Sequence, residues 1–183
     1  GYPSGTLVVA DKQVAGRGRR GRNWDSPSGT GIFMTLMLKP EINPNNASML
    51  TLVAALAVAE AIKDVTGLDA RIKWPNDIVI NGKKICGILT EMSAQFDYIN
   101  HIVIGIGINV HNEAFPEEIS AVAGSILLES GGRRFRRAEI IEKTLEHFEE
   151  YYEIYLQTED LSALTADYNA LLVNMNKQVK VLD

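Results

Sequence analysis

The chain has 183 residues, enough for one well-packed hydrophobic core but short for two ordinary domains. Hydrophobic residues make up 46% of it and charged residues 22%, which is typical of a globular protein, and no apolar run approaches the roughly 20 residues of a membrane span. A net charge of −5 argues against broad nucleic-acid affinity, and a single cysteine excludes an internal disulfide or a cysteine-rich zinc site.

The first part of the chain predicts two strands around one long loop. Residues 6–9 (TLVV) predict a short strand, and residues 31–39 (GIFMTLMLK) predict a strand buried on both faces. Residues 15–31 between them are rich in glycine and arginine and have no hydrophobic period, which predicts a loop. Residues 47–65 then predict an Ala- and Leu-rich helix that Gly67 ends.

The middle of the chain predicts antiparallel strands. Residues 70–74 predict one strand, and residues 78–80 and 84–92 predict a hairpin because Asn81-Gly82 between them is the strongest short turn signal. Residues 101–110 predict a further strand.

Helices gather in the last third, at residues 119–128, 138–157 and 164–173, before a final strand at 178–182. Strands followed by helices indicate an α+β fold, with a mixed, largely antiparallel sheet flanked by helices, rather than regular βαβ repeats.

The stretch Gly16–Gly21 matches G-x-G-x-x-G, but its context excludes two nucleotide motifs. A dinucleotide fingerprint needs a helix that opens at the last glycine, and residues 23–31 (NWDSPSGTG) cannot supply one. A Walker A loop needs Gly-Lys-Ser/Thr, which is missing.

The same stretch carries four arginines within residues 17–22. Guanidinium groups donate paired hydrogen bonds to carboxylate and phosphate oxygens, and glycines let the backbone close tightly, so one interpretation is a lid over an anion. A solvated basic turn or an RNA contact explains this stretch equally well on its own.

The strand 101–110 predicts one apolar face and one emptied face. Glycine costs roughly 0.5–1 kcal/mol inside a strand, so Gly105 and Gly107 in alternation indicate that something lies against them. A flat ligand and a closely packed helix are the two interpretations. The aliphatic positions are Ile102, Ile104, Ile106, Ile108 and Val110.

Lys73 is predicted to project from a strand end, on the face opposite Ile72 and just before Pro75. An ammonium group there would stabilise charge on a phosphate, although a lysine beside a turn is often only solvated. Trp24 and Trp74 are equally open between core or rim packing and base stacking.

Four motifs together resemble the biotin protein ligases in identity, order and spacing. They are GRGRRGRNW (16–24), KWPND (73–77), KICGILTE (84–91) and IGIGINV (104–110). The resemblance covers nearly the whole chain and implies the fold shared with lipoate ligases and class II aminoacyl-tRNA synthetases. It implies a catalytic domain at residues 1–176, with its upstream part missing, and the start of a C-terminal SH3-like domain at 177–183.

The resemblance also implies a role for each matching residue. Lys73 and Arg19 are expected to be catalytic, Asp77 to brace the turn, and no metal ligand is assigned. Biotin or biotinyl-adenylate is expected to meet Gln13, Arg17, Gly18, Arg19, Arg20, Lys73 and Gly87, and the nucleotide to meet Trp24, Gly105, Gly107 and Asn109.

The implied reaction joins biotin to AMP from Mg-bound ATP and then passes biotin to one lysine of a carboxylase's biotin carboxyl carrier protein. No enzyme nucleophile is required, so Cys86 is expected to be a packed strand residue. The resemblance further implies a homodimer, and no DNA binding is ascribed to these residues. No secretory signal is visible, so a cytoplasmic, non-membrane protein is expected.

Two other functions are kept as alternatives. A lipoate or octanoate ligase or transferase has the same fold but needs room for a bare aliphatic chain. An RNA-binding module that uses RGRRGR would show salt-sensitive binding.

Overall fold

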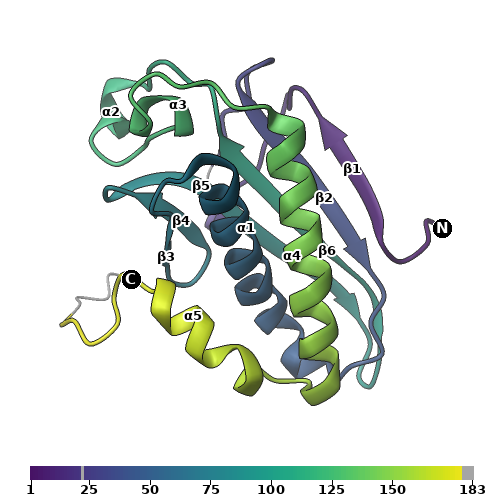
Figure 1. The fold of residues 1–183 in the computed structure, drawn as a ribbon. Coiled ribbons are helices and arrows are strands. Elements are labelled where there is room, and N and C mark those ends of the chain that lie inside the picture. Colours follow the sequence, from purple (N-terminus) through teal and green to yellow (C-terminus); the bar gives the residue numbers. More distant parts are fainter. Residues whose placement is uncertain (22, 179–183) are drawn as a thin grey trace.

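The structure is a computed structural model, and it describes residues 1–21 and 23–178. Six strands form one sheet in the order β1-β2-β6-β5-β4-β3, and every neighbouring pair is antiparallel, which confirms the predicted α+β class (Figure 1). The strands are β1 Thr6–Ala10, β2 Gly31–Leu38, β3 Arg71–Lys73, β4 Asp77–Ile80, β5 Lys83–Ala94 and β6 Ile99–Asn109.

The predicted hairpin is present between β4 and β5. Asn81 and Gly82 both adopt positive φ angles, 51° and 79°, as a two-residue turn that follows the twist of its strands requires. Asparagine and glycine tolerate this region better than other residues, so the turn signal in the sequence reflects the backbone found here.

Two long helices cover one face of the sheet (Figure 1). Helix α1 spans Leu50–Thr66 after a 3-10 turn at Pro44–Met49, and it ends where Gly67 takes a φ of 73°. Its buried alanines allow it to approach the strands closely. Helix α4, Arg137–Thr158, packs beside it, and α5, Thr165–Leu171, follows a 3-10 turn at Ser162–Leu164.

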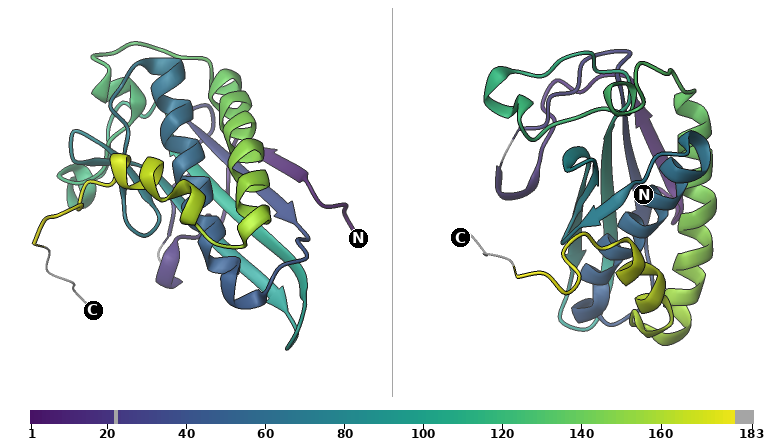
Figure 2. Two further views of the ribbon diagram at one scale, coloured as in Figure 1. Left: turned by 60° about the horizontal axis from the view of Figure 1, so that its bottom comes forward. Right: turned by 60° about the vertical axis from the view of Figure 1, so that its left-hand side comes forward.

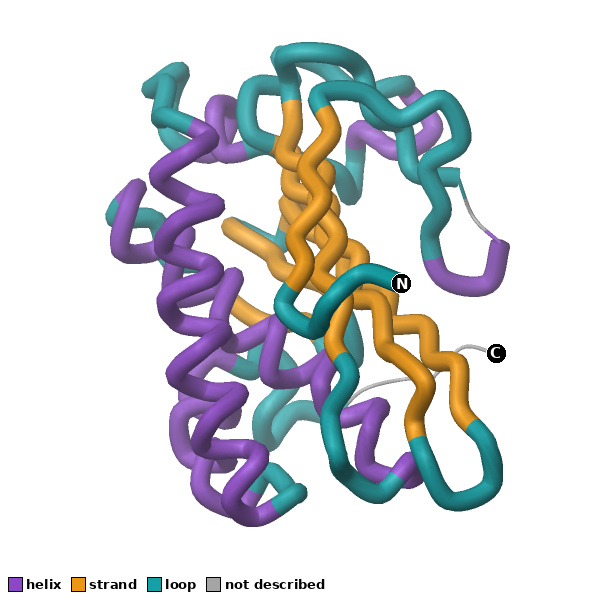
Figure 3. The backbone as a smooth tube through the Cα atoms, turned by 90° about the vertical axis from the view of Figure 1, so that its right-hand side faces the viewer, coloured by secondary structure: helices purple, strands orange, loops and turns teal. Residues whose placement is uncertain are grey.

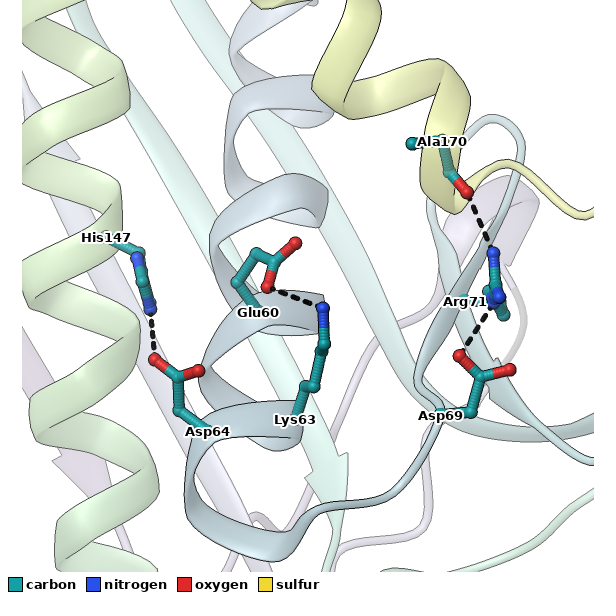
Figure 4. Close-up of polar contacts among 7 residues, drawn as sticks. All are labelled: Glu60, Lys63, Asp64, Asp69, Arg71, His147 and Ala170. Atoms are coloured by element: carbon teal, nitrogen blue, oxygen red, sulfur yellow. Dashed lines mark hydrogen bonds and ion pairs between the residues drawn. The ribbon is translucent and has the colours of Figure 1, made fainter.

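Polar contacts join the elements of this helical face (Figure 4). His147 Nε2 of α4 lies 2.8 Å from Asp64 Oδ2 of α1. The Arg71 guanidinium of β3 donates to the Ala170 carbonyl of α5 at 2.8 Å and pairs with Asp69 at 2.8 Å. Between the helices and the sheet, the alternate isoleucines of β6 are buried in the core, as predicted.

The predicted helix at 119–128 is wrong. The chain forms two short helices instead, α2 Glu117–Ser120 and α3 Ile126–Glu129. Between them, Val122 O accepts from Lys84 N at 2.7 Å and Gly124 N donates to Lys84 O at 2.9 Å. Pairing with β5 therefore replaces the helical hydrogen bonds of this segment, and the Ser125 side chain caps the helix that follows.

The opposite face of the sheet has no long helix among the described residues (Figures 2 and 3). The loop at residues 11–30 lies on this side of the sheet, and α1 and α4 lie on the other. No helix in the described part of the chain has the length and apolar character to cross a membrane. The predicted strand at 178–182 lies, apart from Gln178, outside the described residues, and Gln178 is not in a strand.

Candidate functional site

A row of paired residues crosses the open face of the sheet. Gly107 of β6 is paired with Gly87 of β5, Gly87 with Asp77 of β4, and Asp77 with Lys73 of β3. Residues directly opposite in antiparallel strands point to the same face. The register therefore brings four residues from three of the sequence motifs onto one surface, including the predicted site residues Lys73, Gly87 and Gly107.

The indole of Trp24 lies on this row. A β carbon at Gly107 would sit 2.7 Å from Trp24 Nε1, and one at Gly87 would sit 3.0 Å from Trp24 Cζ3. Both glycines are therefore needed for the close approach of an aromatic ring, and a packed helix does not account for them. Gly105 differs, because its β carbon would meet only the Leu89 carbonyl, at 3.5 Å.

Trp24 keeps an unused donor on this surface. Its Nε1 is buried and has no hydrogen-bond partner within the described part of the chain. A buried donor without an acceptor costs roughly 1–3 kcal/mol, so the indole is held there by its contacts with the glycines rather than by polar bonding.

Lys84 supplies a cation over the indole ring. Its Nζ lies 5.4 Å from the Trp24 ring centroid and 2.6 Å from Asp77 Oδ1. A β carbon at Gly87 would lie 3.4 Å from the same Nζ. The ammonium group is thus fixed beside the glycine face, and its side chain keeps 36% of its surface exposed.

Lys84 is not among the predicted site residues, and strict alternation would place it on the helix side. Lys84 and Gly87 are three residues apart, which puts them on opposite faces of a regular strand. The register of β4 and β5 shifts between Ile78 and Val79, so that Cys86 and Lys84 are paired with consecutive residues. This bulge turns Lys84 toward the open face, and no short-range sequence signal marks it.

Lys73 lies at the outer end of the row. Its side chain is exposed, as is that of Trp74, at 60%. The following turn is fixed to β5, since Asn76 Nδ2 donates to Ile88 O and Ile88 N donates to Asn76 O, both at 2.9 Å. In this motif, therefore, Asn76 braces the turn, and Asp77 pairs with Lys84.

The predicted loop has an ordered base. Gln13 N donates to Ser26 O at 3.2 Å, and the Ser26 hydroxyl donates to Gln13 Oε1 at 2.8 Å. Further along, Trp24 N donates to Gly16 O at 3.0 Å. A β carbon at Gly16 would lie 2.3 Å from Trp24 O, so this glycine permits the two sides of the loop to meet.

The arginines lie at the tip of the loop, on the glycine side of the sheet (Figure 3). Arg17, Arg19 and Arg20 are exposed, Gly18 between them is partly buried, and Arg20 has a φ of 59°. Among the described residues none of these three guanidinium groups forms an ion pair. Three clustered cations without a carboxylate partner favour an anion supplied from outside the chain.

Two further residues have defined surroundings. Asn109 is buried at the end of the glycine face, and its Nδ2 donates to the Gly124 carbonyl at 3.1 Å. Cys86 is buried on the helix side, where burial raises the pKa of its thiol. A thiol held in its neutral form is a poor nucleophile, in agreement with the predicted packing role.

No group of three or more His, Cys, Asp or Glu side chains comes together as a metal site within residues 1–21 and 23–178.

The chain is similar to known proteins over most of its length. Residues 1–109 match the model of the biotin/lipoate A/B protein ligase family. The chain belongs to this family. A bifunctional ligase/repressor BirA from Bacillus subtilis is 49% identical over 156 residues, covering 84% of this chain and 48% of that protein. A biotin--[acetyl-CoA-carboxylase] ligase from Paracoccus denitrificans is 43% identical over 112 residues, covering 60% of this chain and 46% of that protein.

Solved structures of the family share the fold. The biotin protein ligase from Aquifex aeolicus in complex with biotin and ATP has a TM-score of 0.81 and 32% identity, covering 94% of this chain and 71% of that one. The expected ligase-type fold is therefore confirmed. The chain spans about half the length of the curated relatives that it matches.

Proposed function

We propose that this chain is the catalytic part of a biotin protein ligase, which activates biotin with ATP and transfers it to one lysine of a carboxylase's biotin carboxyl carrier protein. Within the family, the names of several relatives support biotin rather than lipoate, since they are biotin--[acetyl-CoA-carboxylase] ligases and a biotin--protein ligase. A related structure was solved with biotin and ATP.

One observation carries the proposal. The cation of Lys84, paired with Asp77, lies beside an open glycine face on which Trp24 rests, and three arginines stand at the tip of the same loop. A flat, anionic, nucleotide-sized molecule matches this combination of an aromatic ring, a surface without side chains and convergent cations. A bare aliphatic chain would leave the cations unused, which disfavours lipoate or octanoate.

The chemistry follows from these groups. A biotin carboxylate oxygen attacks the α-phosphorus of ATP, the bond to the β-phosphate oxygen breaks, and pyrophosphate leaves with that electron pair. Lys84 would stabilise the charge on the α-phosphate oxygens, while Arg17, Arg19 and Arg20 close over the carboxylate and phosphate. The amine of the carrier lysine then attacks the carbonyl of the mixed anhydride, and AMP leaves as the amine loses its proton.

The remaining role assignments belong to the same proposal. Gln13 and Gly87 would meet the ureido ring of biotin. The Trp24 indole, which covers Gly87 and Gly107 in this structure, would move off them and pack on the adenine. The backbones of Gly105 and Gly107 and the side chain of Asn109 would border the nucleotide. Lys73, the lysine predicted to be catalytic, would add its charge near the reacting carboxyl and α-phosphate from the outer end of the row. Magnesium would arrive with the ATP phosphates, as it usually does in nucleotide sites.

The partners and location are also proposed. The carrier domain is the macromolecular partner, and a homodimer follows from the resemblance. The single cysteine favours a reducing, cytoplasmic location, and no DNA binding is assigned to these residues.

Calorimetric titration would test the function. Biotin together with a non-hydrolysable ATP analogue should bind with a 1:1 stoichiometry, whereas lipoate and single-stranded RNA should not. Biotin with ATP should then release pyrophosphate, and an added carrier domain should become labelled on one lysine. Tight binding of lipoate, or salt-dependent binding of RNA alone, would replace the proposal with one of its alternatives.

A further inference from the structure

Arg137, the first residue of α4, contacts both ends of the loop at residues 11–30. Its Nη1 donates to Asp11 Oδ1 at 2.9 Å and to the Gly31 carbonyl at 2.8 Å. Asp11 directly follows β1, and Gly31 opens β2. One guanidinium group therefore holds the residues at which the loop leaves the sheet and returns to it.

Asp11 joins the two sides of the loop at this point. Its carboxylate accepts hydrogen bonds from the Ser28 hydroxyl and, at 3.2 Å, from Gly29 N. These bonds and the contact with Arg137 hold the pKa of Asp11 below its usual range. The carboxylate is consequently charged at neutral pH, so that Arg137 meets a full negative charge as well as a carbonyl dipole.

Arg137 is distinct among the contacts of the loop. Within the described part of the chain, no other side chain from outside residues 11–30 hydrogen-bonds to a group within them. Two backbone hydrogen bonds, from Val110 N and His111 N to the Thr30 carbonyl, also reach this loop. Helix α4 packs along α1 on the far side of the sheet. The guanidinium thus connects the rigid helical layer to the loop that carries Trp24 and the arginines.

We propose that Arg137 is a positioning residue for the loop beside the proposed active site: together with Asp11 it fixes the two residues at which the loop leaves the sheet and returns to it, before substrate arrives. This role rests on the proposed ligase function for its catalytic consequence. The positioning itself is a property of the chain without ligand.

The position of Arg137 predicts an effect on binding more than on chemistry. A lid fixed at its root loses less conformational entropy when it closes on a ligand. Once the ligand is bound, the tip arginines hold the lid through the ligand itself. Loss of Arg137 should therefore raise KM, while kcat changes little.

The same surroundings indicate that the residue can be replaced without unfolding the protein. The Arg137 side chain retains 33% of its surface, and it borders an open surface hollow that Val9, Ile32 and Ile141 also line. Removing the guanidinium group leaves no enclosed cavity and exposes Asp11 to water rather than burying it unpaired.

Arg137→Gln, Asp11→Ala and the double variant form the test, with Arg134→Gln as the matched control. Arg134 belongs to the same basic stretch and pairs with Glu113 at 2.8 Å, but it does not touch the loop. The first measurement needs no substrate: limited trypsin digestion, with cleavage after Arg17, Arg19 and Arg20 followed by mass spectrometry. The second is the KM for ATP and the kcat of biotin-dependent pyrophosphate release.

Arg137→Gln and Asp11→Ala should each speed cleavage at the loop tip and raise KM about tenfold, the usual size of one charge-assisted contact. The double variant should cost less than the sum of the two single effects, because both variants remove the contact between Arg137 and Asp11. Arg134→Gln should match the parent chain in both measurements. A kcat that falls as much as kcat/KM would assign Arg137 to the chemistry instead.

The two proposals fail in different ways. Equal loop cleavage in Arg137→Gln and the parent chain would overturn the positioning role, whatever the substrate. If the parent chain forms no biotinyl-adenylate, the ligase proposal fails, and the digestion still decides whether Arg137 holds the loop.

Discussion

The two faces of the sheet differ in nearly every physical respect. The helix face buries the isoleucines of β6 against α1 and α4, and polar contacts such as His147–Asp64 join its elements. The opposite face lacks side chains at Gly87, Gly105 and Gly107, and a loop stands over it. Because the faces alternate along each strand, one strand supplies stability with half of its residues and a binding surface with the other half.

This difference teaches where tolerance to mutation lies. A close-packed face loses stability when one side chain is shortened, whereas the open face contributes little to the core. Substitutions on the open face should therefore change binding and catalysis without unfolding the chain. Variants on both faces test that separation.

The largest effect is expected for Lys84→Met on the open face. Methionine removes the ammonium group and keeps an apolar stem beside Trp24. Adenylate formation should slow about 10³-fold, because loss of a fixed cation that contacts the transferring phosphate oxygens raises the activation free energy by roughly 4 kcal/mol. Pyrophosphate release measures the rate, and circular dichroism checks the fold. Lys73→Met, from the exposed end of the row, should stay within about tenfold of the parent. The reverse order would return the main role to Lys73.

Ile104→Ala should have the next largest effect, on stability. The fully buried side chain leaves a cavity against α1, so the free energy of unfolding should fall by about 3 kcal/mol. Val103→Ala, one residue earlier and on the other face, should cost about 1 kcal/mol or less. Urea denaturation gives both values. Equal losses would mean that the open face is part of the core.

Gly107→Ala should disturb binding moderately. The added carbon would lie 2.7 Å from Trp24 Nε1 and displace the indole, so the affinity for biotin with the ATP analogue should fall about tenfold, or 1.4 kcal/mol. Trp24 fluorescence in a Trp74→Phe background reports the displacement. Gly105→Ala meets only a carbonyl at 3.5 Å and serves as the control. Unchanged fluorescence in Gly107→Ala would show that the indole does not rest on this glycine.

The smallest effect is expected for His147→Gln. Its contact with Asp64 lies near the surface of the helix face, where such pairs contribute about 1 kcal/mol or less. The unfolding free energy should change within that range, and adenylate formation should be unaffected. A loss of activity would indicate that the helix layer acts on the site through α4.

Local patterns explain which features the sequence predicts. The alternation of β6 predicted both its buried face and its glycine face, and Asn81-Gly82 predicted the hairpin, because these signals depend on neighbouring residues. The helix at 119–128 was mispredicted because that segment pairs with Lys84, a contact between residues far apart in the chain. The positions of Lys84 and Arg137 were also not predicted, since one depends on a bulge and the other on a partner 126 residues away.

The backbone hydrogen bonds of Lys84 affect where chains of this family can differ in length. The main chain of Lys84 is held on one side by β4 and on the other by Val122 and Gly124, and Asn109 in turn donates to the Gly124 carbonyl. Residues 111–121, which connect β6 to this brace, contribute no hydrogen bond to Lys84 itself. Insertions or deletions in that connection should therefore leave the lysine in place, so related chains can acquire new surface segments there without disturbing the proposed site.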